Sequence, residues 1–304
     1  MGKIAFVFAG QGAQHSGMGL DYYEQNDTAK EIFERAEKER SKTLLQCFYS
    51  DEAVLKETRN TQPCMFAFEV AIAQALIEKG VTPDVVAGFS LGELSALAVA
   101  GAASFESLFS LVCKRGALMQ EAAEAHPTAM AAVVKLSNEE VEAICHQFEG
   151  VYPVNYNCVG NVSVAMEEPL MANFKDAVKQ SGGRALPLKV AGGFHSPFMA
   201  EAGAAFADAL KDWQVAPLKM PVIANLNGKA YGEDLKATLA AQMTSPVRWE
   251  ESVRAMIADG VDTFIEIGPG DTLCGMIKRI DGTVALYTTG TYENFEQIVE
   301  EVTK

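Results

Sequence analysis

Residues 84–97 are DVVAGFSLGELSAL, so that a serine stands between two glycines at the end of an apolar run. Residues 85–87 predict the end of a buried strand, and residues 91–100 predict a helix directly after it. In this strand–turn–helix setting, G-x-S-x-G places a nucleophilic serine at the tip of a tight turn, beside helix N–H groups that favour developing negative charge. The pattern predicts an α/β fold with Ser90 as the candidate nucleophile. The alternative is that Ser90 is only a small residue in a turn.

Predicted strands and helices alternate along most of the chain, which is typical of a layered α/β fold with parallel strands. The clearest are strands at 3–10, 84–89, 220–225 and 263–270, and helices at 22–46, 61–80 and 104–125. Residues 128–190 instead follow the order β-α-β-β-α-β, which is ferredoxin-like. We therefore expect a large α/β domain formed by residues 1–124 and 191–304, an inserted ferredoxin-like subdomain of residues 125–190, and a ligand cleft between them.

Composition narrows the partners and the compartment. The net charge of −15 argues against nucleic acid and anionic membranes as partners. No apolar run approaches the ~20 residues of a membrane span, and the first strand is too short for a secretory leader. Six cysteines occur without a C-x-x-C pair, which favours reduced thiols in a cytoplasmic protein, and with only four histidines a metal cluster is not expected.

A serine nucleophile needs a base, and four histidines are available. His195, in VAGGFHSPFM, follows a predicted strand inside a loop whose glycines allow close approach, and is the best candidate. His15 follows a glycine-rich loop and is the second candidate. His126 stands in a polar linker, and His146 lies beside the apolar face of a helix, so we expect it to face solvent. No acidic residue is identifiable as a third member, and a carbonyl group can orient the imidazole instead.

The helix predicted at 104–125 carries an arginine on its apolar face. Arg115 falls in line with Leu108, Val112 and Met119 at spacings of four and three, whereas Lys114 lies on the polar side. A buried guanidinium stays charged and requires an anion. That anion is either an internal carboxylate or the carboxylate of a substrate held by two hydrogen bonds.

Two loops complete the motifs. FAGQGAQHSGMG, at the end of the first predicted strand, is either a plain turn or a loop whose backbone amides point into a cavity and, with an amide beside the elbow, form an oxyanion hole. IEIGPG, at 265–270, predicts a rigid turn after a strand, and Glu266 has no obvious catalytic role, so we interpret this segment as structural.

Taken together, these stretches resemble the malonyl-CoA:acyl carrier protein transacylases over nearly the whole chain. The matching segments are FAGQGAQHSGMG, TQP, GFSLGELSALAVAGAASF, KRGALMQEA, NYN, GGFHSPFM, AQMTSPVRW and EIGPG. The resemblance implies an α/β-hydrolase-like domain with an inserted ferredoxin-like one, and transfer of a malonyl group from malonyl-CoA to the phosphopantetheine thiol of acyl carrier protein through a malonyl-serine. It also implies transient contact with the carrier protein and no metal or redox cofactor, and we expect a monomer.

The resemblance also implies roles for single residues. Ser90 is the implied nucleophile, His195 the base and Arg115 the clamp on the malonyl carboxylate. The backbone N–H groups of Gln11 and Leu91 are implied to form the oxyanion hole, and the carbonyl of Gln242 to orient His195. The site is implied to be lined by Gln62, Asn155 and Asn157. Phe194 is expected to favour malonyl over methylmalonyl groups, because relatives that accept methylmalonyl tend to carry a small residue before the histidine.

Two positions depart from the family pattern. Phe89 stands where the family usually has histidine, and the segment NVSVAM has Asn161 in place of glutamine. Three alternatives to the transacylase remain: a discrete malonyl-loading acyltransferase of a polyketide synthase, a serine hydrolase acting on a carboxylate-bearing thioester, and a carrier-protein-binding module without catalysis. Phe89 is the only feature that supports the last of these.

Overall fold

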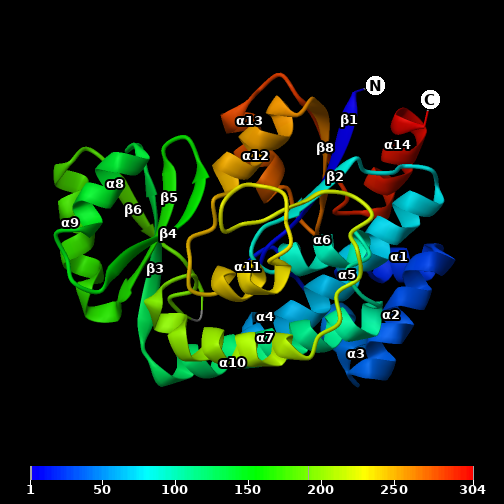
Figure 1. The fold of residues 1–304 in the computed structure, drawn as a ribbon, viewed down its shortest axis with the longest axis horizontal. Helices are drawn as coiled ribbons and strands as arrows, with labels where there is room; N and C mark the ends of the chain where they lie inside the picture. The colour runs from blue at the N-terminus through cyan, green and yellow to red at the C-terminus, as the bar shows by residue number, and fades with distance from the viewer. Residues whose placement is uncertain (1, 191, 304) are drawn as a thin grey trace.

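Two separate sheets form the two lobes seen in the computed structural model, which describes residues 2–190 and 192–303 (Figure 1). The sheet of the larger lobe is parallel and has the order β7-β2-β1-β8-β9. Its strands are β1 (Lys3–Phe8), β2 (Val85–Gly88), β7 (Val222–Ile223), β8 (Val261–Ile267) and β9 (Ala285–Thr288). The predicted α/β fold class, with a parallel sheet and a second, separate sheet, is confirmed.

Helices cover both faces of the parallel sheet, which is why the central strand β1 is apolar without alternation. Phe6 and Phe8 face the larger core, whereas Ala5 and Val7 face a smaller one on the opposite side. The helices of the smaller core are α12 (Trp249–Ala258) and α13 (Thr272–Ile280). The remaining helices of this lobe are α1 (Leu20–Gln25), α2 (Asp27–Glu39), α3 (Thr43–Tyr49), α4 (Glu52–Lys56), α5 (Thr58–Glu78), α6 (Gly92–Val99), α7 (Phe105–Ala125), α10 (Ala200–Lys211), α11 (Leu235–Gln242) and α14 (Tyr292–Val302), with a short 3₁₀ turn at Pro197–Met199.

The segment predicted as one or two helices at 22–46 lies instead within three, α1 to α3. Asn26 ends α1 in an extended conformation, and its side chain accepts a hydrogen bond from the backbone N–H of Ala29 to cap α2. Lys42, with φ of 71°, separates α2 from α3. The periodicity continues across these breaks because all three helices pack against the same core.

The second sheet is antiparallel and has the order β4-β5-β3-β6. Its elements follow in the predicted order: β3 (Thr128–Val134), α8 (Asn138–Cys145), β4 (Val151–Cys158), β5 (Asn161–Glu167), a 3₁₀ turn (Glu168–Leu170), α9 (Met171–Gln180) and β6 (Arg184–Pro187). Ser137 and Glu140 form the capping box that begins α8. This is the strand order of a ferredoxin-like unit; the domain limits at residues 125 and 190 stay a prediction.

Backbone hydrogen bonds attach the small lobe to the large one. The N–H of Val247 donates to the carbonyl of Val154, and the N–H of Tyr156 donates to the carbonyl of Val247, both at 2.9 Å. Asn155, between these two bonds, is thereby fixed at the junction of the lobes.

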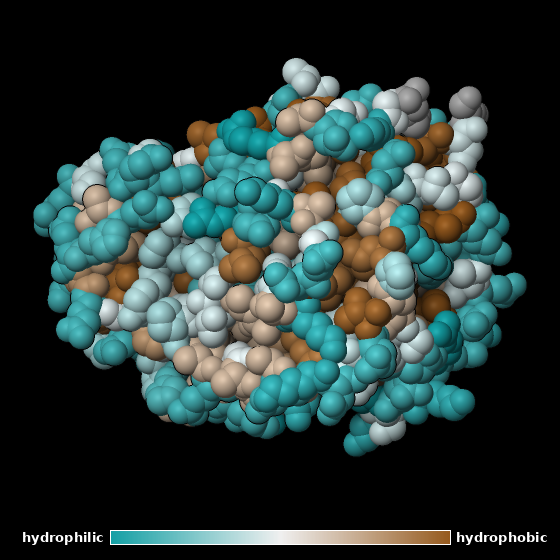
Figure 2. All heavy atoms as spheres, viewed as in Figure 1, coloured by the Kyte–Doolittle hydropathy of each residue, from teal (hydrophilic) through white to brown (hydrophobic). Residues whose placement is uncertain are grey.

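Figure 2 shows hydrophilic side chains over most of both lobes on one face, with hydrophobic side chains gathered over the middle of the larger lobe. Among the described residues, no helix is long and apolar enough to cross a membrane.

Glu266 at the end of β8 has a structural contact. Its buried carboxylate accepts hydrogen bonds from the backbone N–H groups of Leu273 and Cys274, in the first turn of α13. Burial raises the pKa of Glu266 to about 6. The side chain therefore anchors a helix on the sheet, in agreement with the interpretation of IEIGPG as structural.

Candidate active site

Ser90 lies at the tip of the turn between β2 and α6. Its φ of 55° is in the left-handed region, which costs a non-glycine residue free energy. Glycine is required on both sides: a Cβ on Gly88 would lie 1.9 Å from the backbone of Gly92, and a Cβ on Gly92 would lie 2.3 Å from the carbonyl oxygen of Phe8. Asn225 holds the turn, because its Oδ1 accepts from the Ser90 N–H at 2.7 Å and its Nδ2 donates to the Gly88 carbonyl at 2.6 Å.

The structure brings His195 to Ser90, 105 residues apart in sequence. The Nε2 atom of His195 lies 2.6 Å from the Ser90 Oγ, and Nδ1 lies 2.9 Å from the backbone carbonyl oxygen of Gln242. Since that carbonyl only accepts, Nδ1 carries the proton and Nε2 is the acceptor for the serine hydroxyl. Burial, with a contribution from Arg115, lowers the pKa of His195 to about 4. The imidazole is therefore neutral at pH 7, as a general base must be.

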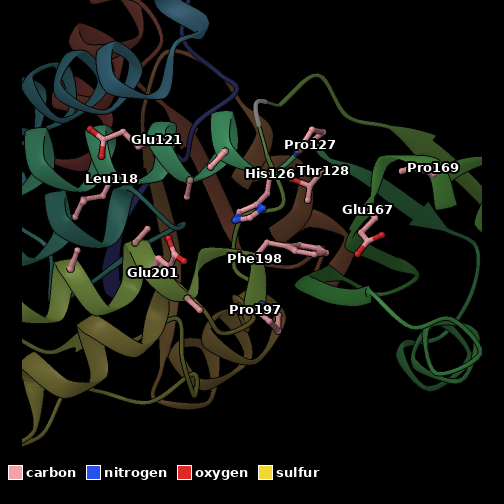
Figure 3. Close-up of a pocket in the computed structure, with 15 residues that line it drawn as sticks. Leu118, Glu121, His126, Pro127, Thr128, Glu167, Pro169, Pro197, Phe198 and Glu201 are labelled. Carbon is pink, nitrogen blue, oxygen red and sulfur yellow. The ribbon is translucent and has the colours of Figure 1, made fainter.

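The three other histidines lie on the surface. His15 is exposed, with Nδ1 3.0 Å from the carbonyl of Ser16, and His146 faces solvent as predicted. His126 lines a second cavity of about 910 Å³, where Figure 3 shows it near Phe198. The one hydroxyl-bearing residue among those described as lining this cavity is Thr128, which accepts a hydrogen bond from the N–H of Gly193. This cavity, although larger, lacks a nucleophile with a base beside it.

Arg115 is fully buried, as its place on the apolar face of α7 predicts. Its Nη1 donates to Oε1 of Gln62 at 3.0 Å, and its Nη2 donates to Oε1 of Gln242 at 2.8 Å and to the Ser90 Oγ at 3.3 Å. In the described part of the chain the guanidinium has no ion-pair partner, and its Nε is buried without a hydrogen bond. The internal-carboxylate alternative therefore has no direct ion pair behind it: neutral amide oxygens accept from the guanidinium beside the nucleophile, and the carboxylate of Glu93 reaches it only through Gln242.

A cavity of about 430 Å³ opens at Ser90 and His195. Gln11 and Leu91 both line it, and neither backbone N–H donates to another of the described residues. Both amides are thus available to an oxyanion. The other predicted residues that line this cavity are Gln62, Phe194, Asn155 and Asn157.

The two asparagines differ in their bonding. Asn157 donates to the side chains of Asn161 and Ser163, so that the residue replacing the family's glutamine is part of the cavity wall. The Oδ1 of Asn155 is buried without a hydrogen bond. Asn155 therefore presents an unused acceptor at the junction of the lobes, on the wall of the cavity.

Three groups at the site were missed by sequence reasoning: the buried Glu93 and Asn225, and the half-buried Tyr231. The clue for Glu93 was a carboxylate three residues after the nucleophile, in a helix whose other side chains are apolar apart from Ser95. Asn225 ends a predicted strand, and polar residues at the carboxyl ends of parallel strands commonly face a site. Tyr231 lies in a loop, and no pattern in the sequence identifies it.

With this geometry in place, the comparisons define the class of protein. The chain matches the model of the acyl transferase domain over residues 5–281 and belongs to that family. It is 37% identical to the malonyl CoA-acyl carrier protein transacylase of Bacillus subtilis, over 99% of this chain and 97% of that protein. The crystal structure of the corresponding transacylase of Clostridium perfringens superposes with a TM-score of 0.95 at 34% identity, covering 99% of this chain and 97% of that one. A malonyl-transacylase solved in complex with its type II polyketide acyl-carrier protein gives a TM-score of 0.94 at 34% identity, with coverage of 98% and 99%.

Proposed function

We propose that this chain transfers a malonyl group from malonyl-CoA to the phosphopantetheine thiol of acyl carrier protein. The observation that carries the proposal is Arg115, a buried cation without an ion-pair partner among the described residues, whose Nη2 lies 3.3 Å from the Ser90 Oγ. Its Nε has no hydrogen bond and its Nη2 contact with Ser90 is long, so these two donors are available to a carboxylate on the acyl group. A thioester that bears a second carboxylate fits this arrangement, and a neutral acyl group leaves the guanidinium unpaired.

In the first half-reaction the Ser90 Oγ attacks the thioester carbon while Nε2 of His195 takes the hydroxyl proton. The backbone N–H groups of Gln11 and Leu91 receive the developing oxyanion. The carbon–sulfur bond then breaks, the CoA sulfur leaves with the proton from His195, and malonyl-Ser90 remains. The Gln242 carbonyl keeps the Nδ1 proton in place throughout, so that Nε2 alone exchanges protons.

In the second half-reaction the phosphopantetheine thiol of the carrier protein attacks the malonyl-serine. His195 takes the thiol proton, the same two amides hold the second oxyanion, and His195 returns the proton to Ser90 as the ester bond breaks. Neither step calls for a metal or redox group, since the first exchanges a thioester for an ester and the second exchanges that ester for a thioester. Ser90, His195 and Arg115 all come from one chain, so a single copy can carry out both half-reactions, and we propose a monomer as the active unit.

The carrier protein and the compartment follow from the same chemistry. The similar malonyl-transacylase solved with a type II polyketide carrier protein supports a carrier protein as the acceptor, and it also keeps polyketide loading as a second candidate pathway. All six cysteines are free thiols, and cysteines stay reduced in the cytoplasm, which supports a cytoplasmic location.

Mass spectrometry of the intact protein tests this proposal. Brief exposure to malonyl-CoA should add one malonyl group, located on Ser90 by peptide mapping, and it should persist until carrier protein is added. Rapid loss of the adduct to water would instead assign the chain as a hydrolase, and absence of any adduct would assign it as a binding module.

A further inference from the structure

Glu93, in the first turn of α6, is a fully buried carboxylate to which the mechanism above gives no role. Its Oε1 accepts from the Tyr231 hydroxyl at 2.5 Å and from the Asn225 backbone N–H at 3.1 Å. Its Oε2 accepts from Nε2 of Gln242 at 2.6 Å. The Asn225 N–H and the Gln242 amide nitrogen can only donate, and the Tyr231 hydroxyl donates here, so the position suits a group that accepts, as a carboxylate does. A glutamine here would bring its own N–H donors into a cage of donors.

The contact with Gln242 sets the direction of that residue's side-chain amide. Nε2 of Gln242 donates to Glu93 and also to the Ser90 carbonyl at 2.7 Å, so both of its hydrogens are used on that side. The Oε1 atom consequently faces Arg115, whose Nη2 lies 2.8 Å away. The backbone carbonyl of the same Gln242 holds Nδ1 of His195. Gln242 thus links the guanidinium, the base and the nucleophile, and Glu93 determines, together with the Ser90 carbonyl, which way its amide points.

We propose that Glu93 is a positioning residue for malonyl transfer, which by orienting the Gln242 amide holds the Arg115 guanidinium beside Ser90. Its carboxylate also interacts electrostatically with the Arg115 guanidinium, an interaction that a neutral residue cannot supply. The inference rests on the proposed function, because the position of Arg115 matters only for an acyl group that carries a carboxylate. A purely structural role would slow the use of every acyl group alike.

The test compares kcat/KM for malonyl-CoA and for acetyl-CoA in three variants. Glu93→Gln keeps the shape but adds donors, and should lower the malonyl-to-acetyl ratio about tenfold or more, since a charge-assisted contact is misplaced. Glu93→Asp restores an acceptor-only group and should recover part of that ratio. Tyr231→Phe is the matched control: it removes one donor to the same carboxylate, leaves the Gln242 contact, and should keep the ratio within about twofold.

The proposal would be overturned if Glu93→Gln lowered kcat/KM equally for malonyl-CoA and acetyl-CoA. It would also be overturned if the malonyl-to-acetyl ratio were as low in Glu93→Asp as in Glu93→Gln. If Glu93→Gln lacks the native circular dichroism spectrum, Glu93→Asp is the deciding variant. Its malonyl-to-acetyl ratio must fall at least about threefold below that of the wild type, because the shorter side chain withdraws from Gln242. A ratio equal to that of the wild type refutes the role. The wild-type adduct separates the two inferences. If the wild type forms malonyl-Ser90 but the variants keep an unaltered malonyl-to-acetyl ratio, only the positioning role of Glu93 is refuted. If the wild type forms no malonyl-Ser90, the proposed function itself is refuted.

Discussion

Replacement of Arg115 should change which acyl group the enzyme prefers. In the free protein Nε is unused and Nη2 donates to Ser90 only at 3.3 Å, so a malonyl carboxylate gains two charge-assisted hydrogen bonds. At ~1.5–3 kcal/mol each, their loss in Arg115→Ala amounts to about 3–6 kcal/mol, or roughly 10²–10⁴-fold in kcat/KM for malonyl-CoA. Acetyl-CoA loses none of this, and the penalty of leaving a guanidinium unpaired disappears.

The assay measures transfer to carrier protein from malonyl-CoA and acetyl-CoA in parallel, and the melting temperature controls for folding. Arg115→Met is the matched control variant, because it fills the buried space while removing the charge and the donors. It should show the same reversal of preference with a smaller fall in melting temperature. If kcat/KM fell equally for malonyl-CoA and acetyl-CoA and the melting temperature also fell, Arg115 would only hold Gln62 and Gln242 in place.

Other perturbations address the base, the nucleophile and the pocket. Ser90→Ala and His195→Ala should each lower transfer by ~10⁴-fold or more, and Ser90→Ala should also prevent formation of the malonyl adduct. If His15→Ala is inactive instead of His195→Ala, then His15 and not His195 is the base. Because the pKa of His195 is lowered to about 4 and the neutral form is the base, kcat/KM for acetyl-CoA at pH 5.5 should stay within about twofold of that at pH 7.5. An ordinary histidine would lose about tenfold over that interval. Phe194→Ser should narrow the malonyl-to-methylmalonyl ratio by at most tens of fold, since one methyl group accounts for ~1–3 kcal/mol, and an unchanged ratio would place the discrimination elsewhere.

The parts of this molecule that local patterns determine were predictable. The elbow needs two glycines and a serine within five residues, and the face of α7 that buries Arg115 repeats over four turns, so both were visible in the sequence. The capping box at Ser137 and Glu140 is similarly local. Helices α4 and α10 to α14 and strand β9 were not individually predicted. Strand β9 has four residues, lies at the edge of the sheet, and is half-buried without clear alternation.

The bonding partners of the site residues could not be predicted in the same way. Helix periodicity places Arg115 inside, but its acceptors come from Gln62 on α5 and Gln242 at the end of α11, far away in sequence. The network around Glu93 likewise joins four separate segments, and only the packing of the sheet brings them together. The resemblance supplied Gln242 as the group that orients His195; the contact of its side chain with Arg115 is visible only in the structure.

Phe89 is the position at which this chain departs most visibly from its family. Its ring packs against Trp249 in a T-shaped contact, with centroids 5.7 Å apart, and lines the cavity beside Gly10. A phenyl ring cannot donate a hydrogen bond or carry a proton. If an acid or base were essential here, its absence would cost ~10²–10⁴-fold and this protein would be nearly inert.

We expect an active enzyme, because the dyad, the two free amides and Arg115 account for every proton and charge in both half-reactions, and Phe89 adds packing and excludes water. Phe89→His should therefore change transfer to carrier protein by less than about tenfold and raise hydrolysis of the malonyl-enzyme slightly, since a polar ring beside Ser90 holds water better than a phenyl ring. The measurement follows both fates of the malonyl-enzyme side by side, loss to carrier protein and loss to water. A gain in transfer of about a hundredfold or more would show that the natural chain is an impaired enzyme, and would favour the carrier-protein-binding module over the transacylase.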